Sequence, residues 1–222
     1  TDVSEYLHQA IAAGKNIMFE AQLGALRDID LGIYPYTSSS STIAAYAPIG
    51  AGIPGEQLTD IIGIMKAYST CVGEGPFTVE LFGDEAEALR KAGGEYGAAT
   101  GRPRRVGPFD IPASRYGVRV QGATEIALTK LDVLSYLDRI PVCVAYEVDG
   151  ERTVNFPTGE RLDRAKPIIE YVPGFGDVSG CRTWESLPRA AKDYVRYLEE
   201  AVGCRITYVS VGAGRDEYVK VD

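Results

Sequence analysis

Apolar residues recur at helical spacing in several stretches of the chain, most clearly toward its C-terminal end. Between residues 186 and 202 they lie three and four positions apart, at Leu187, Ala190, Ala191, Tyr194, Val195 and Leu198. This pattern predicts an amphipathic helix with Ser186 as its N-cap and Gly203 as its end. Weaker patterns predict helices over residues 4–13, over 84–91 with Asp84 as cap and Gly93-Gly94 as end, and over 111–120.

Short apolar runs between these helices predict strands. Buried strands are expected over residues 16–19, 61–65, 125–129 and 205–210, and a hairpin is expected to join 141–148 to 151–156 around Asp149-Gly150. Because strands alternate with helices in the later part of the chain, we predict an α/β fold with a mixed, largely parallel sheet and flanking helices. No repeat, low-complexity linker or domain boundary divides residues 1–222.

Composition narrows the class of protein. The 222 residues, with a mass of 24.0 kDa, are enough to bury a substantial core. A formal net charge of −8 repels nucleic acid, so no nucleic-acid partner is expected. No apolar run approaches about 20 residues, and no signal-peptide pattern opens the chain. The expectation is therefore a cytoplasmic protein without a membrane partner.

Cysteine and histidine usage excludes several kinds of site. Cys71, Cys143, Cys181 and Cys204 lie far apart and form no Cys-x-x-Cys pair, so buried free thiols are expected rather than a zinc site or a disulfide framework. His8 is the only histidine, which leaves almost nothing for a Ser-His-Asp triad or a histidine-based metal site.

One loop concentrates positive charge in this acidic chain; it reads Ala98-Ala99-Thr100-Gly101-Arg102-Pro103-Arg104-Arg105. Guanidinium groups bind carboxylate and phosphate through paired hydrogen bonds, so the loop predicts a pocket for a small anion. The alternative is a set of surface ion pairs. The nearest carboxylates in sequence are Glu95 and Asp110, and with so little compensation we expect residues 94–107 to be poorly ordered without a ligand.

A second candidate site follows two predicted strands. Lys130 and Asp132 come directly after residues 125–129, and Ser210 and Gly212 end the strand 205–210. Ligands of α/β sheets bind outside the carboxyl ends of strands, so these loops are expected to share one edge. A carboxylate there can accept hydrogen bonds from the ring N–H and the amine of guanine, while the lysine stem covers the base. The alternative for Asp132 is the N-cap of a helix over residues 133–137.

The polar stretch from Glu20 to Ser41 is harder to interpret. Gln22 with Asp28 and Asp30 fits either a polar turn or groups that read a base and a phosphate. The hydroxyl run over residues 37–41 fits either a solvated loop or a phosphate contact. The chain contains no G-x-x-x-x-G-K-[ST] motif, so no phosphate loop is visible.

Taken together, these motifs resemble the C-terminal portion of the adenylosuccinate synthetase family along essentially the whole chain. The resemblance rests on Phe19-Glu20-Ala21-Gln22-Leu23-Gly24, Asp28-Ile29-Asp30, Tyr34-Pro35-Tyr36-Thr37-Ser38-Ser39, Lys66-Ala67-Tyr68-Ser69-Thr70, Gly73-Glu74-Gly75-Pro76-Phe77, Thr100-Gly101-Arg102-Pro103-Arg104-Arg105, Thr129-Lys130-Leu131-Asp132-Val133-Leu134 and Ser210-Val211-Gly212.

The resemblance implies a ligase of purine nucleotide synthesis that makes adenylosuccinate from IMP and L-aspartate, with GTP and Mg²⁺, as a homodimer. By resemblance, the loop Ala98, Ala99, Thr100, Gly101, Arg102, Pro103 and Arg104 would close on aspartate and approach IMP. Lys130, Leu131 and Asp132 would frame guanine, Ser210, Val211 and Gly212 would cap it, and Arg104 would lie between aspartate and nucleotide. Gln22 would read the hypoxanthine and Ser38 would contact the IMP phosphate.

Three departures from the family pattern matter. The family reads Phe-Glu-Gly-Ala-Gln-Gly, so here Gln22 stands one place early and Leu23 occupies the glutamine position. Either Thr37 or Ser38 could supply the hydroxyl after Tyr-Pro-Tyr. The family's phosphate loop, general-base aspartate, Mg²⁺ ligands and catalytic histidine have no counterpart in these residues, so no catalytic or metal residue is assigned to this chain.

Without those groups, we expect the chain to be a C-terminal fragment of the enzyme that is inactive alone. The alternative is a non-catalytic module that binds guanine nucleotides, anions or a partner.

Overall fold

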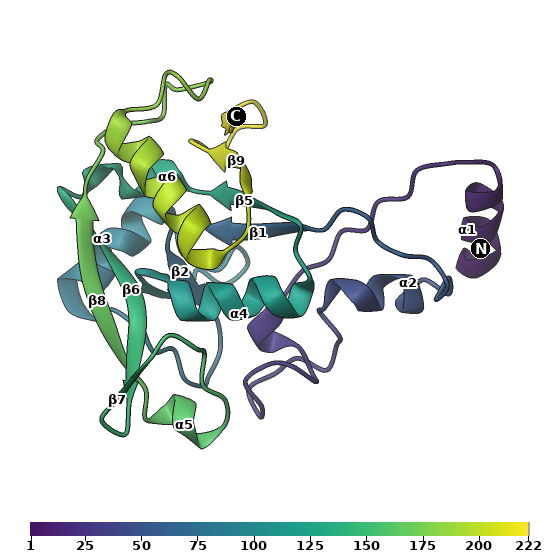
Figure 1. Cartoon of the computed structure of the whole chain (residues 1–222), viewed down its shortest axis with the longest axis horizontal. Coiled ribbons are helices and arrows are strands. Elements are labelled where there is room, and N and C mark those ends of the chain that lie inside the picture. Colours follow the sequence, from purple (N-terminus) through teal and green to yellow (C-terminus); the bar gives the residue numbers. More distant parts are fainter. Residues whose placement is uncertain (222) are drawn as a thin grey trace.

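The computed structural model describes residues 1–221. Figure 1 shows a main body, in which sheets and helices pack together, and an N-terminal arm that extends away from it. The arm carries α1 (Val3–Ala12), η2 (Ala44–Tyr46) and α2 (Ala47–Gly50), whereas η1 (Ala25–Arg27) contacts the main body. No helix within residues 1–221 is both long and apolar enough to cross a membrane.

The first sheet carries the strands whose ends form one candidate site. It consists of β1 (Ile62–Lys66), β5 (Glu125–Thr129), β9 (Ile206–Ser210) and β10 (Tyr218–Lys220), in that order. β1, β5 and β9 are parallel, whereas β10 runs antiparallel to β9. The predicted α/β class with a largely parallel sheet is therefore confirmed, and the carboxyl ends of three strands meet at one edge.

The second sheet is built around the long strand β6 (Arg139–Val148). β6 pairs in parallel with β4 (Phe109–Asp110) and antiparallel with β7 (Glu151–Thr153) and β8 (Lys166–Pro173). The predicted hairpin is confirmed: Asp149 and Gly150, which join β6 to β7, both have positive φ angles, as a tight turn between twisted strands requires. β7 is shorter than expected, and β8 was not predicted.

A two-stranded antiparallel ribbon brings together two loops that matter below. It pairs β2 (Ser69–Cys71) with β3 (Arg105–Gly107). β2 leads into residues 71–75, and β3 receives the arginine loop. The ribbon therefore holds these two loops beside each other.

Three helices pack on the sheets, and all three were predicted. α6 (Arg189–Val202) buries Ala191, Tyr194, Val195 and Leu198, four of the positions that the helical spacing indicated, together with Val202, and it ends at Gly203. α3 (Gly83–Gly93) ends at Gly94, and α4 (Ile111–Gln121) ends at Gly122, each in the left-handed conformation that glycine adopts most easily. The short helices are η3 (Leu131–Tyr136) and α5 (Glu160–Asp163).

Two predicted helix caps are wrong. α6 begins after Pro188, and the Ser186 hydroxyl instead accepts hydrogen bonds from the backbone N–H groups of Arg182 and Thr183 in the preceding turn. α3 begins after Phe82 without a side-chain cap, so Asp84 lies inside its first turn. In both cases the helix start differs from the predicted one by one to three residues, enough to move a polar side chain out of the capping position.

Two strand predictions also need correction. Residues 16–19 form no strand, and the side chain of Met18 is 91% exposed. No neighbouring strand in the described part of the chain lies there to pair with them. Residues 62–66 do form β1, but Ile62 and Ile64 are exposed, because β1 is the edge strand of its sheet.

Candidate functional site

The first candidate site lies where β5 and β9 end side by side. The backbone N–H of Lys130 donates to the Ser210 hydroxyl over 2.9 Å, so the two loops after these strands meet as the sequence predicted. Lys130 has a φ of 62°, in the left-handed region that is uncommon for residues other than glycine. The folded chain tolerates a strained conformation at the edge of the sheet, which is typical of functional positions.

Asp132 holds a buried oxygen that lacks a hydrogen-bond partner within residues 1–221. It lies in η3, whose cap position is Lys130, so the alternative that Asp132 is a helix N-cap is wrong. Its Oδ1 atom is buried without a partner, and burial raises the pKa of the carboxyl above its ordinary value. A carboxylate in this state offers an acceptor to any donor that enters the site.

The loop after β9 closes the other side of this site. Val211 is buried, and its N–H donates to the Glu217 carbonyl over 2.9 Å. A Cβ atom at Gly212 would lie 2.3 Å from Oε2 of Glu217, and that oxygen accepts a hydrogen bond from the Gly214 N–H. A larger residue at position 212 would therefore displace the Glu217 carboxylate. We call Lys130–Asp132 with Ser210–Gly212 the base rim.

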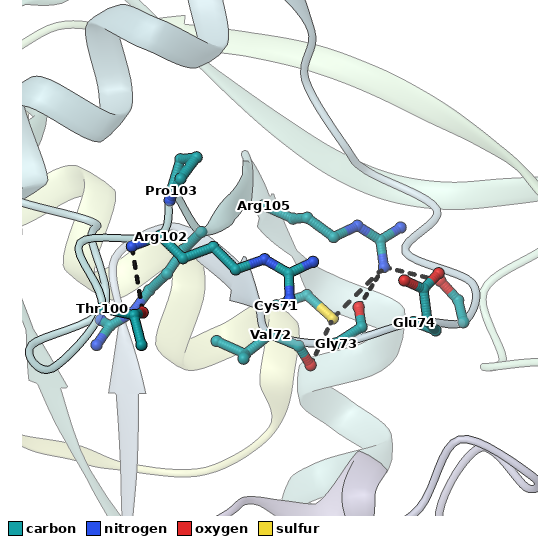
Figure 2. A pocket seen from close by; sticks show the side chains of 11 residues that line it. Cys71, Val72, Gly73, Glu74, Thr100, Arg102, Pro103 and Arg105 are labelled. Carbon is teal, nitrogen blue, oxygen red and sulfur yellow. Dashed lines mark hydrogen bonds between the residues drawn. The ribbon is translucent and has the colours of Figure 1, made fainter.

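The second candidate site is a cavity of about 620 Å³ between the two loops that flank the β2–β3 ribbon (Figure 2). It is lined by Cys71, Val72, Gly73, Glu74, Gly75, Gly97, Thr100, Arg102, Pro103, Arg104 and Arg105. All three arginines of the sequence motif line it, so a cavity lies where the sequence predicts an anion pocket. Ala98 and Ala99 lie in the same loop, and both are exposed.

The three arginines have different surroundings. Arg105 donates to Glu80 over 2.5 Å and to the carbonyls of Gly73 and Gly75, so its guanidinium fastens residues 71–75 to the ribbon. Arg104 forms an ion pair with Glu95 at 2.8 Å. The guanidinium of Arg102 has no hydrogen-bond or ion-pair partner in the described residues; only its backbone is bonded, through the N–H to the Thr100 hydroxyl and through the carbonyl, which accepts from the Gly97 N–H.

These contacts correct the expectation that the loop lacks compensating charge. Arg104 and Arg105 each pair with a carboxylate, whereas the guanidinium of Arg102 has no carboxylate partner in the described residues. Glu80 is distant in sequence and was missed. Asp110 takes no part, because its carboxylate accepts from the Tyr146 hydroxyl and caps α4 through the Ala113 N–H.

Glu95, which the sequence indicated only as one of the nearest carboxylates to the arginine loop, contacts residues of both candidate sites. Its side chain is fully buried, yet it contacts cationic groups from three parts of the chain. Burial alone would raise the pKa of Glu95, but hydrogen bonds from Lys66, Tyr68 and Arg104 lower it to about 2. The only signal in the sequence was its position between the end of a helix and the arginine loop.

Gln22 and Ser38 do not line the cavity. Gln22 is exposed just before η1, and Leu23, with a φ of 79°, is 50% exposed. The Ser38 hydroxyl donates to the Ser40 carbonyl and accepts from the Ser40 N–H. The backbone N–H of Ser38 donates to the Arg27 carbonyl.

Arg27 connects this segment to the cavity wall. Its guanidinium donates to the carbonyls of Tyr36, Val72 and Glu74, so these hydrogen bonds hold residues 20–41 against residues 71–75.

Residues 1–221 contain no group of three or more His, Cys, Asp and Glu side chains placed to hold a metal ion. The four cysteines are free thiols.

Comparison with known proteins decides the family. The family model described as adenylosuccinate synthetase matches residues 1–219. An adenylosuccinate synthetase of Mycobacterium marinum is 47% identical over 220 residues, which are 98% of this chain and 51% of that protein. One from Trichlorobacter lovleyi is 46% identical over 222 residues, 99% of this chain and 52% of that protein. The chain belongs to the adenylosuccinate synthetase family.

Solved structures of related proteins agree. The fully ligated adenylosuccinate synthetase of Plasmodium falciparum matches all of this chain and 54% of that one, with a TM-score of 0.94 and 35% identity. The cyanophage S-2L succinoaminodeoxyadenylate synthetase, bound to dGMP and dATP, matches with a TM-score of 0.60 at 17% identity, which shows a shared fold alone. The chain spans about half the length of the adenylosuccinate synthetases it matches.

Proposed function

We propose that this chain supplies the guanine-recognising and aspartate-recognising part of an adenylosuccinate synthetase. The complete enzyme would be a ligase of purine nucleotide synthesis that joins IMP and L-aspartate at the expense of GTP. By family resemblance it would act as a cytoplasmic homodimer. Mg²⁺ would accompany the GTP phosphates, held by residues outside this chain.

The unpartnered oxygen of Asp132 is the observation that carries the proposal. A buried acceptor without a donor costs about 1–3 kcal/mol, so the fold retains Asp132 at a measurable penalty. The N1–H and the 2-amino group of guanine are two donors on one edge of the base, and they match a carboxylate. Adenine presents neither donor at the equivalent positions. Lys130, Leu131, Ser210, Val211 and Gly212 would enclose the same base.

The cavity supports the second half of the proposal. Arg102 carries the one unpaired guanidinium of the arginine loop in the described residues, and Thr100 lies beside it in the lining. A dicarboxylate such as aspartate needs two cationic or donor groups at a fixed separation, and a cavity of about 620 Å³ has room for it beside part of a nucleotide. Gln22 or Leu23, and Thr37 or Ser38, would contact IMP from the neighbouring segment.

Base selectivity tests the proposal. We expect the chain to bind GDP in preference to ADP and XDP, measured by isothermal titration calorimetry. Asp132→Asn replaces one acceptor oxygen by an amide donor, which opposes the guanine amino group but suits the 2-oxo group of xanthine. GDP affinity should fall by about 1–3 kcal/mol while XDP affinity rises.

Asp177→Asn is the matched control for Asp132→Asn. Asp177 is an exposed carboxylate whose charge also raises the pKa of Asp132, but within residues 1–221 its side chain bonds only to Ser179. The control should therefore keep the preference for GDP. Equal affinities of the Asp132→Asn variant and the unmodified chain for GDP would contradict the assignment of Asp132.

A further inference from the structure

Glu95 lies between the base rim and the cavity, in the turn that follows α3. Its side chain is 0% exposed, and a buried carboxylate is costly unless cations and donors surround it. Here Oε1 accepts from Lys66 Nζ at 2.8 Å and from the Tyr68 hydroxyl at 2.5 Å, and Oε2 accepts from Arg104 at 2.8 Å. Lys130 Nζ lies 3.5 Å from Oε1.

The contact with Arg104 fixes the cavity side. The guanidinium of Arg104 meets the Glu95 carboxylate, and the backbone N–H of Arg104 also donates to the Glu95 carbonyl over 2.9 Å. The Arg104 carbonyl accepts from Arg90 Nε at 3.0 Å. Arg104 is therefore held at three points, two of them on Glu95, so its direction at the cavity wall depends on that residue.

The contact with Lys130 fixes the base rim. The ammonium group of Lys130 donates to the Gly93 carbonyl over 2.6 Å and faces the Glu95 carboxylate. A Cβ atom at Gly93 would lie 2.3 Å from the Tyr68 hydroxyl, so glycine allows Tyr68 to reach Glu95 at this point. The Lys130 stem is thereby drawn across the rim instead of extending into solvent.

We propose that Glu95 is a positioning residue shared by both sites, with one buried carboxylate orienting Arg104 at the cavity and Lys130 at the base rim. The inference rests on the proposed function, because it concerns how the same two sites are organised. Buried ion pairs contribute little net stability compared with apolar packing, whereas removing one partner is costly. Orientation of two ligand-binding side chains is a role that apolar packing could not supply.

A double-mutant cycle on the 222-residue chain tests this role. The probes are GDP for the base rim and L-aspartate for the cavity, each titrated into the unmodified chain, Glu95→Gln, Arg104→Gln, Lys130→Gln and the two double variants that contain Glu95→Gln. We expect Glu95→Gln to lower the affinity for each probe by roughly fivefold to tenfold, which is the effect of losing or misaligning one hydrogen bond.

The cycle separates positioning from general damage. In the Arg104→Gln background, adding Glu95→Gln should not lower the affinity for aspartate further, but it should still lower the affinity for GDP. In the Lys130→Gln background, adding Glu95→Gln should not lower the affinity for GDP further, but it should still lower the affinity for aspartate. Losses that persist undiminished in both backgrounds would overturn the proposal, as would unchanged affinities in Glu95→Gln. A chain that binds neither probe would instead contradict the proposed function itself.

Two further variants keep the test decisive. Glu80→Gln removes the carboxylate partner of another cavity arginine that has no contact with Lys130, so GDP affinity should stay unchanged; a loss equal to that in Glu95→Gln would mean general loosening and would overturn the proposal. If circular dichroism shows Glu95→Gln unfolded, Glu95→Asp carries the same cycle. It keeps the charge, but its shorter side chain cannot reach both Arg104 and Lys130.

Discussion

Lys130 and Asp132 each cost the folded chain free energy at the same edge of the sheet. Lys130 has a left-handed backbone conformation, and Asp132 has a buried oxygen without a partner in the described residues. Sequence reasoning could place both after a strand, because the apolar run 125–129 is unambiguous. It could not separate a ligand-binding Asp132 from a helix cap, since that distinction depends on where the helix begins and on a backbone angle.

Asp110 gives a residue-scale prediction about pH. Burial raises its pKa to about 6, although hydrogen bonds from Tyr146 and the Ala113 N–H oppose the shift. Between the ordinary value of 3.8 and about 6, the folded chain therefore binds a proton that the unfolded chain does not. The stability from this group is complete below pH 3.8 and is lost as the pH rises through 6, by about 3 kcal/mol in total.

Asp110→Asn isolates that contribution. Asparagine can still cap α4 and accept from Tyr146, but it does not titrate. Urea unfolding at pH 4, 5, 6 and 7 should show the free energy of unfolding of the variant rising relative to the unmodified chain across this range, then staying constant above it. The Glu95 carboxyl, whose pKa is lowered from 4.5 to about 2, changes stability in the opposite sense as the pH falls below 4.5. This contribution is present in both proteins, so it cancels in the difference between them. Parallel curves for the two proteins would refute the assignment to Asp110.

At the scale of elements, the sequence predicted helices and strands with regularly spaced apolar residues, but it did not predict which short segments pair as strands. α6, α4, β5 and β9 were predicted within three residues at each end, since their apolar positions face one core. The strand expected at residues 16–19 failed because an apolar run becomes a strand only when a neighbour pairs with it. β2 and β3 are short and carry no alternation, so the ribbon that builds the cavity could not be inferred from local pattern.

The arginine loop was half predictable for a related reason. Its charge and glycine content indicated an anion pocket, and a cavity is there. Which arginine remains available depends on Glu80 and Glu95, and Glu80 lies 25 residues from its partner Arg105. Long-range ion pairs of this kind leave no local trace in the sequence.

Two arginines that line the cavity, Arg102 and Arg105, should respond differently to the same substitution. Arg102→Leu removes an exposed, unpaired guanidinium, so we expect weaker aspartate binding with the free energy of unfolding changed by less than about 0.5 kcal/mol. Arg105→Leu removes the bonds to Glu80, Gly73 and Gly75, and should destabilise the fold by about 1–3 kcal/mol. Calorimetric titration with L-aspartate and urea unfolding of both variants provide the comparison. Unchanged aspartate affinity in Arg102→Leu would favour the surface ion-pair interpretation of the loop.

At the scale of the whole molecule, binding groups and catalytic groups are unevenly distributed. The base rim and the cavity are both built from elements of the main body, and Glu95 contacts Arg104 of the cavity and Lys130 of the base rim. No phosphate-loop motif occurs in the sequence, and no metal-binding cluster occurs within residues 1–221. Phosphoryl transfer depends on a cation and on positioned donors that neutralise the developing charge, so recognition of substrates alone should not accelerate it.

We therefore predict that the 222-residue chain binds guanine nucleotide without making adenylosuccinate. Incubation with IMP, L-aspartate, GTP and Mg²⁺, followed by chromatographic detection of the product, should give no more than a control without protein. Titration with GDP on the same preparation shows that the chain is folded and competent to bind. Product above the control, lost again in Asp132→Asn, would show that the residues described here suffice for phosphoryl transfer and would overturn the division between recognition and catalysis.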